Sequence, residues 1–423
     1  MTIRKASAWT VRLLALMAIG GSTIAAAHAG TRANAHWVTT WAASPEARWD
    51  GDFALPLNLP FHLWDQTLRQ VVRVSLGGKQ VRIVLSNTYG DTPLVIGNVH
   101  IAAAADGANI VAGTDHALTF SGQTRVSIPP GASVLSDPVA WKIDASSDLA
   151  VSLYVPEPTP PATFHWDARQ TAYLGAGDQA ASVAFKTDTS LTTRVFLSAV
   201  MVDAVASAQA VATLGDSITD GAAASMDGNT RWPDFLARRL RPYDVAVVNA
   251  GISGARLLRN KMGENALARF GRDVLDQPGV KTVIVMLGIN DISWLDTPLG
   301  LHDATPAPEQ MIAGYRQLIA QAHLRGVRVV GATLTPFEGA LIDTPMKHYY
   351  SADKERVREA VNQWIRSSGE FDAVVDFDAA LRDPAHPQRL LPANDSGDHL
   401  HPGDAGNKAM ADAIDLSVLL GRH

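Results

Sequence analysis

A serine between two glycines and a distant histidine form the strongest candidate for chemistry in this chain. The segment GDSITDG at residues 215–221 places Ser217 directly after a short apolar run. Serine is a weak nucleophile unless a base removes its proton, and the segment alone is equally typical of a serine that caps a helix. The segment DHLHP at residues 398–402 supplies a candidate base. An aspartate three residues before a histidine can hold one ring nitrogen while the other faces a serine, which is the arrangement of a Ser-His-Asp triad.

The two histidines of this downstream segment are alternative bases. We assign the base to His401 and its orienting acid to Asp398. His399 is adjacent to Asp398, which makes the same geometry harder, so we interpret His399 as a loop residue. The pair could also bind zinc, but no third ligand lies near it in the sequence, and a zinc site usually needs one. We therefore expect no metal and no cofactor.

Two further segments could supply donors to an oxyanion. Gly251 lies in NAGISG at residues 249–254, and Asn290 lies in LGIND at residues 287–291. The backbone N–H groups of Ser217 and Gly251 and the amide of Asn290 would together stabilise a developing negative charge. The alternative interpretation of Gly251 is an ordinary strand-to-loop turn, and that of Asn290 is a turn residue or helix cap.

These segments follow apolar runs that read as buried parallel strands. The runs occupy residues 211–214, 245–248, 282–287, 327–334 and 373–377. Segments of helical length lie between them at residues 232–240, 264–275, 308–324 and 352–366, and a last helix begins near Pro402. Strand–helix alternation predicts a doubly wound α/β sheet, in which ligands bind at the carboxyl ends of the strands. The candidate residues therefore lie where such a fold places its sites.

The region before residue 205 has a different pattern. Short alternating runs occur at residues 92–101, 124–128, 134–141, 149–155 and 195–202, separated by Gly, Pro, Asn and Asp. In residues 68–85, apolar residues alternate on both sides of Gly77-Gly78, which predicts a β-hairpin. We find no helical period here and expect an all-β sandwich with a jelly-roll-like arrangement.

The four segments resemble the four blocks of the SGNH, or GDSL-type, hydrolase family. The residues that carry the resemblance are Gly215-Asp216-Ser217, Gly251, Gly288-Ile289-Asn290-Asp291 and Asp398-x-x-His401, and the similarity covers residues 208–420. The resemblance implies a flavodoxin-like three-layer α/β/α fold, no metal, and hydrolysis of carboxylic esters. It also implies that Ser217, Asp398 and His401 form the triad, with Gly251 and Asn290 in the oxyanion hole.

The β region looks like that of a secreted bacterial subgroup similar to xylanase-associated arylesterases and acylhydrolases. This resemblance points to short-chain acyl or aryl esters, or to acetyl groups on plant polysaccharide. Trp294, Arg256 and His165 are candidates for substrate contact. Each has a simpler interpretation, which is packing for Trp294 and His165 and surface charge for Arg256.

The N-terminus predicts export. Positive residues precede a short apolar run at residues 13–19, and Ala27-His28-Ala29 offers a cleavage site, so residues 1–29 read as a signal peptide. An uncleaved membrane anchor is the alternative. We expect a β-sandwich domain at residues 30–205 and a hydrolase domain at residues 206–423, in a secreted or periplasmic protein.

The amino-acid composition argues against some classes of binding partner. The net charge is −6 and there is no long basic run, which argues against nucleic acid. The sequence has no cysteine, which excludes disulfides and thiolate metal sites. The expected partner is a small-molecule or polysaccharide ester. The rival functions are a lipid-directed hydrolase such as a lysophospholipase, and a carbohydrate-binding protein with an idle hydrolase domain.

Overall fold

Five parallel strands form the centre of the C-terminal half. The computed structural model describes residues 35–49 and 53–421. The strands are β16 (Gln209–Gly215), β17 (Val245–Gly251), β18 (Val280–Met286), β19 (Arg328–Ala332) and β20 (Ala373–Val375). They pair in the order β17-β16-β18-β19-β20, all parallel. This is the flavodoxin-like strand order, and the predicted fold class is confirmed.

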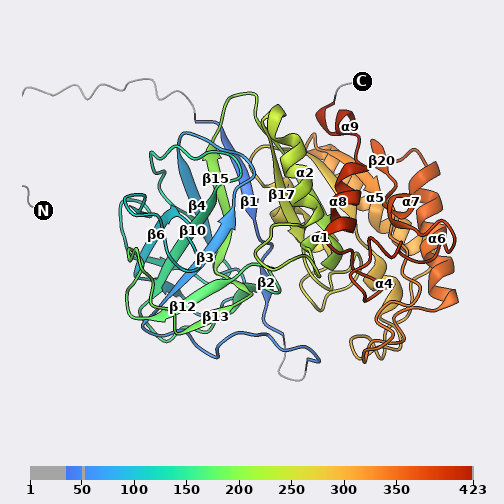
Figure 1. The fold of residues 1–423 in the computed structure, drawn as a ribbon, viewed down its shortest axis with the longest axis horizontal. Helices are drawn as coiled ribbons and strands as arrows, with labels where there is room; N and C mark the ends of the chain where they lie inside the picture. Colours follow the sequence, from blue (N-terminus) through green and yellow to red (C-terminus); the bar gives the residue numbers. More distant parts are fainter. Residues whose placement is uncertain (1–34, 50–52, 422–423) are drawn as a thin grey trace, which may run out of the picture. The chain divides into compact units, whose positions relative to one another are not determined.

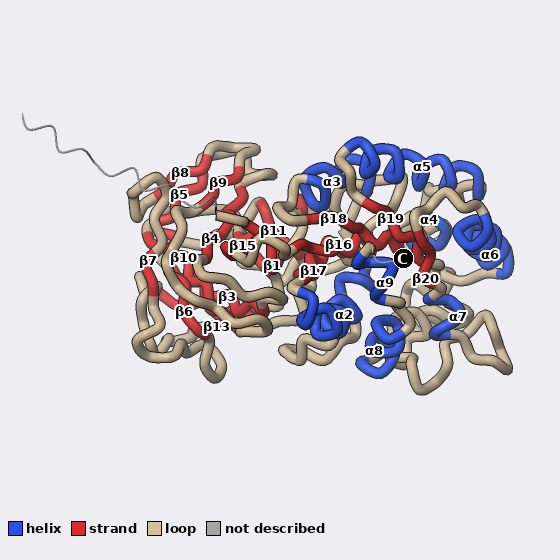
Figure 2. Tube along the Cα trace, turned by 90° about the horizontal axis from the view of Figure 1, so that it is seen from above, coloured by secondary structure: helices blue, strands red, loops and turns tan. Residues whose placement is uncertain are grey.

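Helices cover both faces of this sheet. They are α1 (Ser217–Asp220), α2 (Trp232–Leu240), α3 (Ala266–Phe270), α4 (Ile289–Ser293), α5 (Pro308–Leu324), α6 (Ala352–Ser367), α7 (Phe377–Leu381), α8 (Asp404–Asp412) and α9 (Leu416–Leu420). A 3-10 turn, η1 (Arg241–Tyr243), follows α2, and a π turn, η2 (Gly271–Leu275), follows α3. Figure 2 shows α3, α5 and α6 on one face and α2, α7 and α8 on the other. The three layers explain why the strands are almost continuously apolar, because each is buried on both sides.

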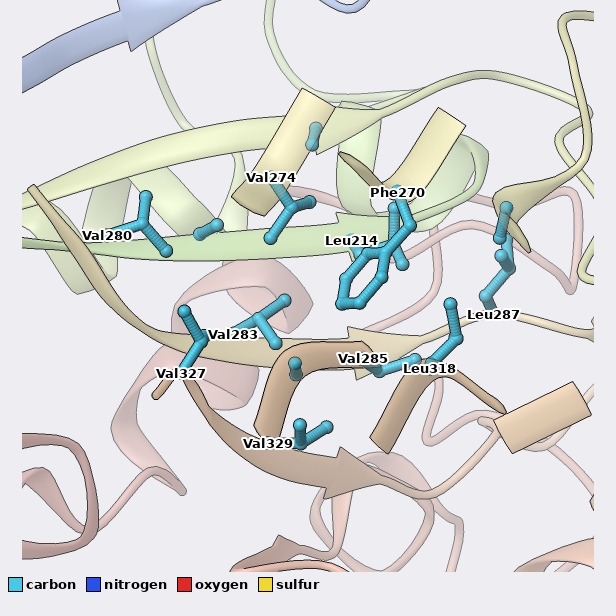
Figure 3. Packing of buried hydrophobic residues seen from close by; sticks show 14 of the residues in the cluster. Leu214, Phe270, Val274, Val280, Val283, Val285, Leu287, Leu318, Val327 and Val329 are labelled. Carbon is cyan, nitrogen blue, oxygen red and sulfur yellow. The ribbon is translucent and has the colours of Figure 1, made fainter. Parts of the chain in front are cut away.

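The core on the α3–α5 face is built from valine, leucine and phenylalanine side chains. Val283 and Val285 of β18 pack beside Phe270 of α3 and Leu318 of α5, as Figure 3 shows, and all four are nearly fully buried. This packing holds the strands of the sheet in place close to their carboxyl ends. The site residues at that edge therefore stand on a rigid base.

The predicted last helix is interrupted. The apolar pattern after Pro402 predicts one helix, but α8 ends at Asp412 and α9 begins at Leu416. The side chain of Asp415 accepts a hydrogen bond from Ser417 N at 2.9 Å and so caps α9. A local cap of this kind competes with continuation of the preceding helix, and the helical pattern alone did not reveal it.

The N-terminal region is antiparallel. Its strands are β1 (Trp37–Ala42), β2 (Glu46–Ala47), β3 (Gln66–Arg73), β4 (Val81–Ser86), β5 (Leu94–Ile96), β6 (Asn98–Ala103), β7 (His116–Ala117), β8 (Val126–Ile128), β9 (Ser133–Leu135), β10 (Asp148–Val155), β11 (Thr163–His165), β12 (Ala172–Ala176), β13 (Thr189–Leu191), β14 (Arg194–Val195) and β15 (Leu197–Asp203). One sheet has the order β1-β15-β4-β9 and a second has the order β13-β12-β3-β10-β6-β7. Two smaller sheets have the orders β14-β11-β2 and β5-β8. Figure 1 shows these strands, in blue and green, gathered at one end of the described chain.

The predicted hairpin at residues 68–85 is wrong in its pairing. Both strands form, but β3 pairs with β10 and β12, whereas β4 pairs with β15 and β9 in the other sheet. The turn at Gly77-Gly78 therefore crosses between two sheets. Alternating apolar residues on both strands point into one shared core, and that pattern is the same for a hairpin and for an arch between facing sheets. A Cβ at Gly77 would lie 2.3 Å from the carbonyl oxygen of Ile143, so glycine is needed for this close approach.

The β region packs directly on the α/β region. Residues 36–423 form one compact unit, in which Val38, Leu76 and Val202 of the β region belong to the same buried cluster as the strands of the parallel sheet. The division into domains at residues 30–205 and 206–423 stays a prediction. The predicted signal peptide at residues 1–29 lies outside the described residues. None of the helices in the described part of the chain has the length and apolar character that a membrane crossing requires.

Candidate active site

Ser217 is the first residue of α1, directly beyond the carboxyl end of β16. The cap of α1 is Asp216, whose side chain accepts a hydrogen bond from Ile218 N at 3.1 Å. The capping role that competed for Ser217 is thus filled by its neighbour, and the Ser217 hydroxyl is available for other contacts. Burial raises the pKa of Asp216 to about 7.

A chain of hydrogen bonds joins Ser217 to the predicted histidine and aspartate. His401 Nε2 lies 2.9 Å from Ser217 Oγ, and His401 Nδ1 lies 2.6 Å from Asp398 Oδ2. The other oxygen of Asp398 accepts the backbone N–H groups of Leu400 and His401 at 2.9 and 2.8 Å. Burial would raise the pKa of Asp398, but its hydrogen bonds with His401 hold that pKa well below its usual range. The ionised carboxylate can only accept, so Nδ1 carries the proton and Nε2 is free to accept the serine proton.

His399 is directed elsewhere. Its Nδ1 lies 2.5 Å from Asp395 Oδ2, and about half of its side chain is exposed. It does not line the cavity that contains Ser217. The structure therefore brings His401, and not His399, to the serine.

The amide of Asn290 has a fixed orientation. Asn290 Oδ1 accepts hydrogen bonds from Trp294 Nε1 at 2.9 Å and from the Tyr349 hydroxyl at 2.7 Å. The indole N–H can only donate, so the atom it meets must be the amide oxygen. Asn290 Nδ2 donates to the carbonyl of Ala255 at 3.0 Å, which leaves one of its two hydrogens for another acceptor. Asn290 lines the cavity beside Ser217.

Gly251 does not reach this cavity. Its N–H donates to Asn249 Oδ1 at 2.9 Å, and a Cβ at this position would lie 2.4 Å from the backbone N of Asp220. A glycine is needed at this position because β17 lies so close to α1 that no side chain would fit between them. Gly254, three residues later, lines the cavity with a φ of 75°, and its N–H has no acceptor among the residues that the structure describes. The sequence signal for Gly254 is that it is the second glycine of the segment GISG. A loop that turns back toward the strand end needs left-handed backbone, which glycine adopts easily.

The cavity is large and mostly apolar. Its volume is about 480 Å³, and Ser217, Asn290 and His401 lie in its wall. Its apolar walls include Leu55, Trp166, Met262, Leu299, Leu341 and Met346. Leu55 and Trp166 come from the β region, so both regions of the chain shape the site.

The three candidates for substrate contact lie in different places. Trp294 lines the cavity and is nearly fully buried. Arg256 lies outside the cavity, with its guanidinium 4.4 Å from the centre of the Trp294 ring and 2.5 Å from Asp303. His165 also lies outside it, buried between the Ser44 carbonyl and Asp220. The structure therefore brings only Trp294 to the cavity.

Other buried carboxylates hold the loops of the site. Asp291 accepts the backbone N–H groups of Leu257 and Leu258 at 2.6 and 2.9 Å, and burial raises its pKa to about 6. Within the described ranges, no group of three or more His, Cys, Asp or Glu side chains is arranged to hold a metal ion. The polar side chains that this edge of the sheet presents to the cavity include a hydroxyl, an imidazole and an amide, those of Ser217, His401 and Asn290.

Part of the chain matches a known protein family. Residues 211–414 match the model of the family GDSL-like Lipase/Acylhydrolase. A search of curated proteins found no match.

Three solved structures illustrate the similarity. An aryl esterase from M. smegmatis is 18% identical with a TM-score of 0.39, over 51% of this chain and 99% of its own. A carbohydrate acetylesterase from Sinorhizobium meliloti is 17% identical with a TM-score of 0.39, over 50% of this chain and 99% of its own. A variant of an acetyl xylan esterase from Geobacillus stearothermophilus is 24% identical with a TM-score of 0.38, over 50% of this chain and 95% of its own. On the family match, residues 211–414 form a GDSL-like lipase/acylhydrolase domain, the domain of a carboxylic ester hydrolase.

Proposed function

We propose that the protein hydrolyses esters by two-step acyl transfer, with Ser217 as nucleophile, His401 as general base and Asp398 as its orienting acid. The observation that carries the proposal is the unbroken hydrogen-bonded chain from Ser217 Oγ through His401 to Asp398. The depressed pKa of Asp398 supports it, because an ionised carboxylate stabilises the imidazolium that forms during the reaction.

The first step forms an acyl-enzyme. Ser217 Oγ attacks the ester carbonyl carbon while His401 Nε2 takes the hydroxyl proton. The tetrahedral intermediate then breaks its bond to the alcohol oxygen, and His401 returns the proton to that leaving group. In the second step a water molecule, deprotonated by His401, attacks the acyl carbon. The carboxylic acid leaves and Ser217 regains its proton.

The oxyanion would rest on three donors. They are the backbone N–H of Ser217, the free hydrogen of Asn290 Nδ2 and the backbone N–H of Gly254, which replaces Gly251 in our proposal. Ser217, Asn290 and Gly254 all line the one cavity. Neither backbone N–H has an acceptor within the described part of the chain, as expected of donors that await a charge.

We propose aryl or short-chain acyl esters as substrates. The support is the cavity of about 480 Å³ with leucine, methionine and tryptophan walls, which is within the range that encloses a small apolar ligand. A series of p-nitrophenyl esters of increasing acyl length, with acetylated xylan and lysophospholipids alongside, tests this. Highest kcat/KM on long acyl chains would favour the lipid-directed alternative, and highest kcat/KM on acetylated xylan would favour the polysaccharide.

Replacing the serine tests the assignment of the nucleophile. Ser217→Ala is expected to lower kcat/KM on p-nitrophenyl acetate by a factor of about 10⁴ or more. The matched control is Ser225→Ala, because the Ser225 hydroxyl bonds to Asp404 at 2.6 Å and does not line the cavity. Activity retained in Ser217→Ala, or lost equally in both variants, would refute the assignment.

We also propose that the protein is exported and that residues 1–29 are removed. The support is the positive and apolar pattern of that segment, followed by Ala27-His28-Ala29. N-terminal sequencing of the exported protein is expected to begin at Gly30. An intact residue 1 on exported protein would contradict the proposal.

A further inference from the structure

We propose that His165, from strand β11 of the β region, is a positioning residue for ester hydrolysis that holds the Gly254 loop in place through Asp220. The inference rests on the proposed function, since it assigns Gly254 a donor's role. It also gives the β region a part in the reaction that goes beyond lining the cavity.

The imidazole of His165 is held at both nitrogens. Nδ1 lies 3.0 Å from the carbonyl oxygen of Ser44, and Nε2 lies 3.0 Å from Asp220 Oδ1. Both partners can only accept, so both nitrogens donate and the ring is a cation. Burial would lower the pKa of His165, but the charge of Asp220 and the hydrogen bond to it raise that pKa to about 9. Glu46 Oε1 lies 3.6 Å from His165 Nδ1.

Asp220 connects His165 to the loop that carries Gly254. Its second oxygen, Oδ2, accepts the backbone N–H of Ser253 at 3.0 Å and the Ser253 hydroxyl at 2.8 Å. Ser253 directly precedes Gly254, and Asp220 is the last residue of the short helix that begins with Ser217. One carboxylate therefore ties the nucleophile's helix to the loop that carries Gly254, and His165 fixes that carboxylate.

Removing the imidazole would disturb this tie. Asp220 is only 4% exposed, and without His165 its charge would be buried with no cation bonded to it. Other cations nearby already have their own contacts. Arg269 donates to the carbonyls of Gly215 and Ala250 and pairs with Asp273. Arg231 and Arg194 line the same small cavity as Asp220, where Arg231 pairs with Asp234 and Arg194 lies against the ring of Trp41. A buried carboxylate that loses its bonded cation is costly and moves or draws in water, and either change alters how Oδ2 holds Ser253.

The effect should fall on the transition state. An oxyanion donor acts on charge that develops after the ground state, so a shifted Gly254 N–H lowers kcat and leaves KM nearly unchanged. Displacement of a catalytic group by about 1 Å can cost about 100-fold in rate. His165 of the β region would therefore influence catalysis although it does not contact the substrate.

The test compares two replacements of His165 in the full-length protein. His165→Phe keeps an aromatic ring and removes both donors, and is expected to lower kcat on p-nitrophenyl acetate by about 10- to 100-fold with KM within about twofold. His165→Gln restores one N–H toward Asp220 and is expected to recover part of the loss. The control is His100→Phe, because His100 forms a similar pair with Asp115, at 2.9 Å, wholly within the β region. It is expected to keep the wild-type kcat.

The outcomes separate this inference from the proposed function. If Ser217→Ala is inactive while folded His165→Phe keeps kcat within about twofold, the proposed function stands and the inference is overturned. If His165→Phe does not fold, Ser253→Ala removes the hydroxyl bond at the other end of the same link. A fall in its kcat at constant KM supports the inference, and an unchanged kcat overturns it. Where both variants fold, the double variant should lose less than the product of the single losses.

Discussion

Replacing Tyr349 with phenylalanine removes one of the two donors that orient the Asn290 amide. The hydroxyl is fully buried and lies 2.7 Å from Asn290 Oδ1, so the substitution deletes this hydrogen bond and keeps the ring. Trp294 Nε1 still donates to the same oxygen at 2.9 Å. The amide therefore keeps its orientation, through Trp294 and the Ala255 carbonyl, but loses one of the two donors to its oxygen.

The magnitude follows from the net worth of such a bond. A buried neutral hydrogen bond contributes about 1 kcal/mol, so the free energy of unfolding is expected to fall by that amount. If the same loss of about 1 kcal/mol reaches the transition state through Asn290 Nδ2, kcat falls about 5-fold, because about 1.4 kcal/mol is tenfold in rate. KM should stay constant, because the amide meets the charge that develops in the reaction and not the neutral ester.

The assay is steady-state turnover of p-nitrophenyl acetate together with urea unfolding. The matched control is Tyr315→Phe, whose equally buried hydroxyl donates to the Leu287 carbonyl at 2.6 Å and makes no bond to Asn290. It should lose similar stability with little change in kcat. Equal kcat values for the two variants would refute the view that Tyr349 acts through the amide of Asn290.

Further changes test the electrostatics of the site. Because burial raises the pKa of Asp216 from 3.8 to about 7, the folded state holds its proton where the unfolded state has lost it, and stability should fall as pH rises between those values. Asp216→Asn keeps the cap and should remove that decline, at about 1.4 kcal/mol per pH unit, in urea unfolding from pH 4 to pH 8; equal slopes would contradict this. Arg269→Met removes a buried guanidinium that pairs with Asp273 and donates to the carbonyls of Gly215 and Ala250. Asp273 keeps its pair with Arg272, so the expected cost of about 3 kcal/mol in the same measurement comes also from the two carbonyls left without this donor, and a loss below about 1 kcal/mol would speak against it. His399→Ala should keep wild-type kcat/KM while His401→Ala loses activity, and the reverse pattern would exchange their roles.

Much of the α/β region was predictable because its signals are local. Helix α2 begins at Trp232 and ends at Leu240, the bounds that its apolar spacing predicts, and α5 likewise spans Pro308–Leu324. The candidate positions of Ser217 and Asn290 followed from the strands, because each lies within a few residues of the carboxyl end of a buried strand. Short helices such as α4 were missed, because five residues are too few to show a helical period.

Pairing between strands was harder to predict. Alternation tells which side chains are buried but not which strand lies beside which, and β3 and β4 face one another across a shared core instead of forming a hairpin. The same limit applies to Gly251 and Gly254. Gly251 ends β17 and Gly254 follows it in the loop, and the choice between them depends on which N–H is already bonded, here that of Gly251 to Asn249.

His165 belongs to no sequence motif of the site, yet its burial points to a partner near Ser217. It lies in β11 (Thr163–His165), where all three residues are buried. A histidine on a strand with both faces covered must find partners for its ring nitrogens, because an unpaired buried polar group is costly. Those partners proved to be Ser44 in the β region and Asp220 beside the nucleophile. A buried charged residue in one region is therefore a signal for a buried counter-charge in the other, and here that counter-charge stands at the end of the helix that presents Ser217.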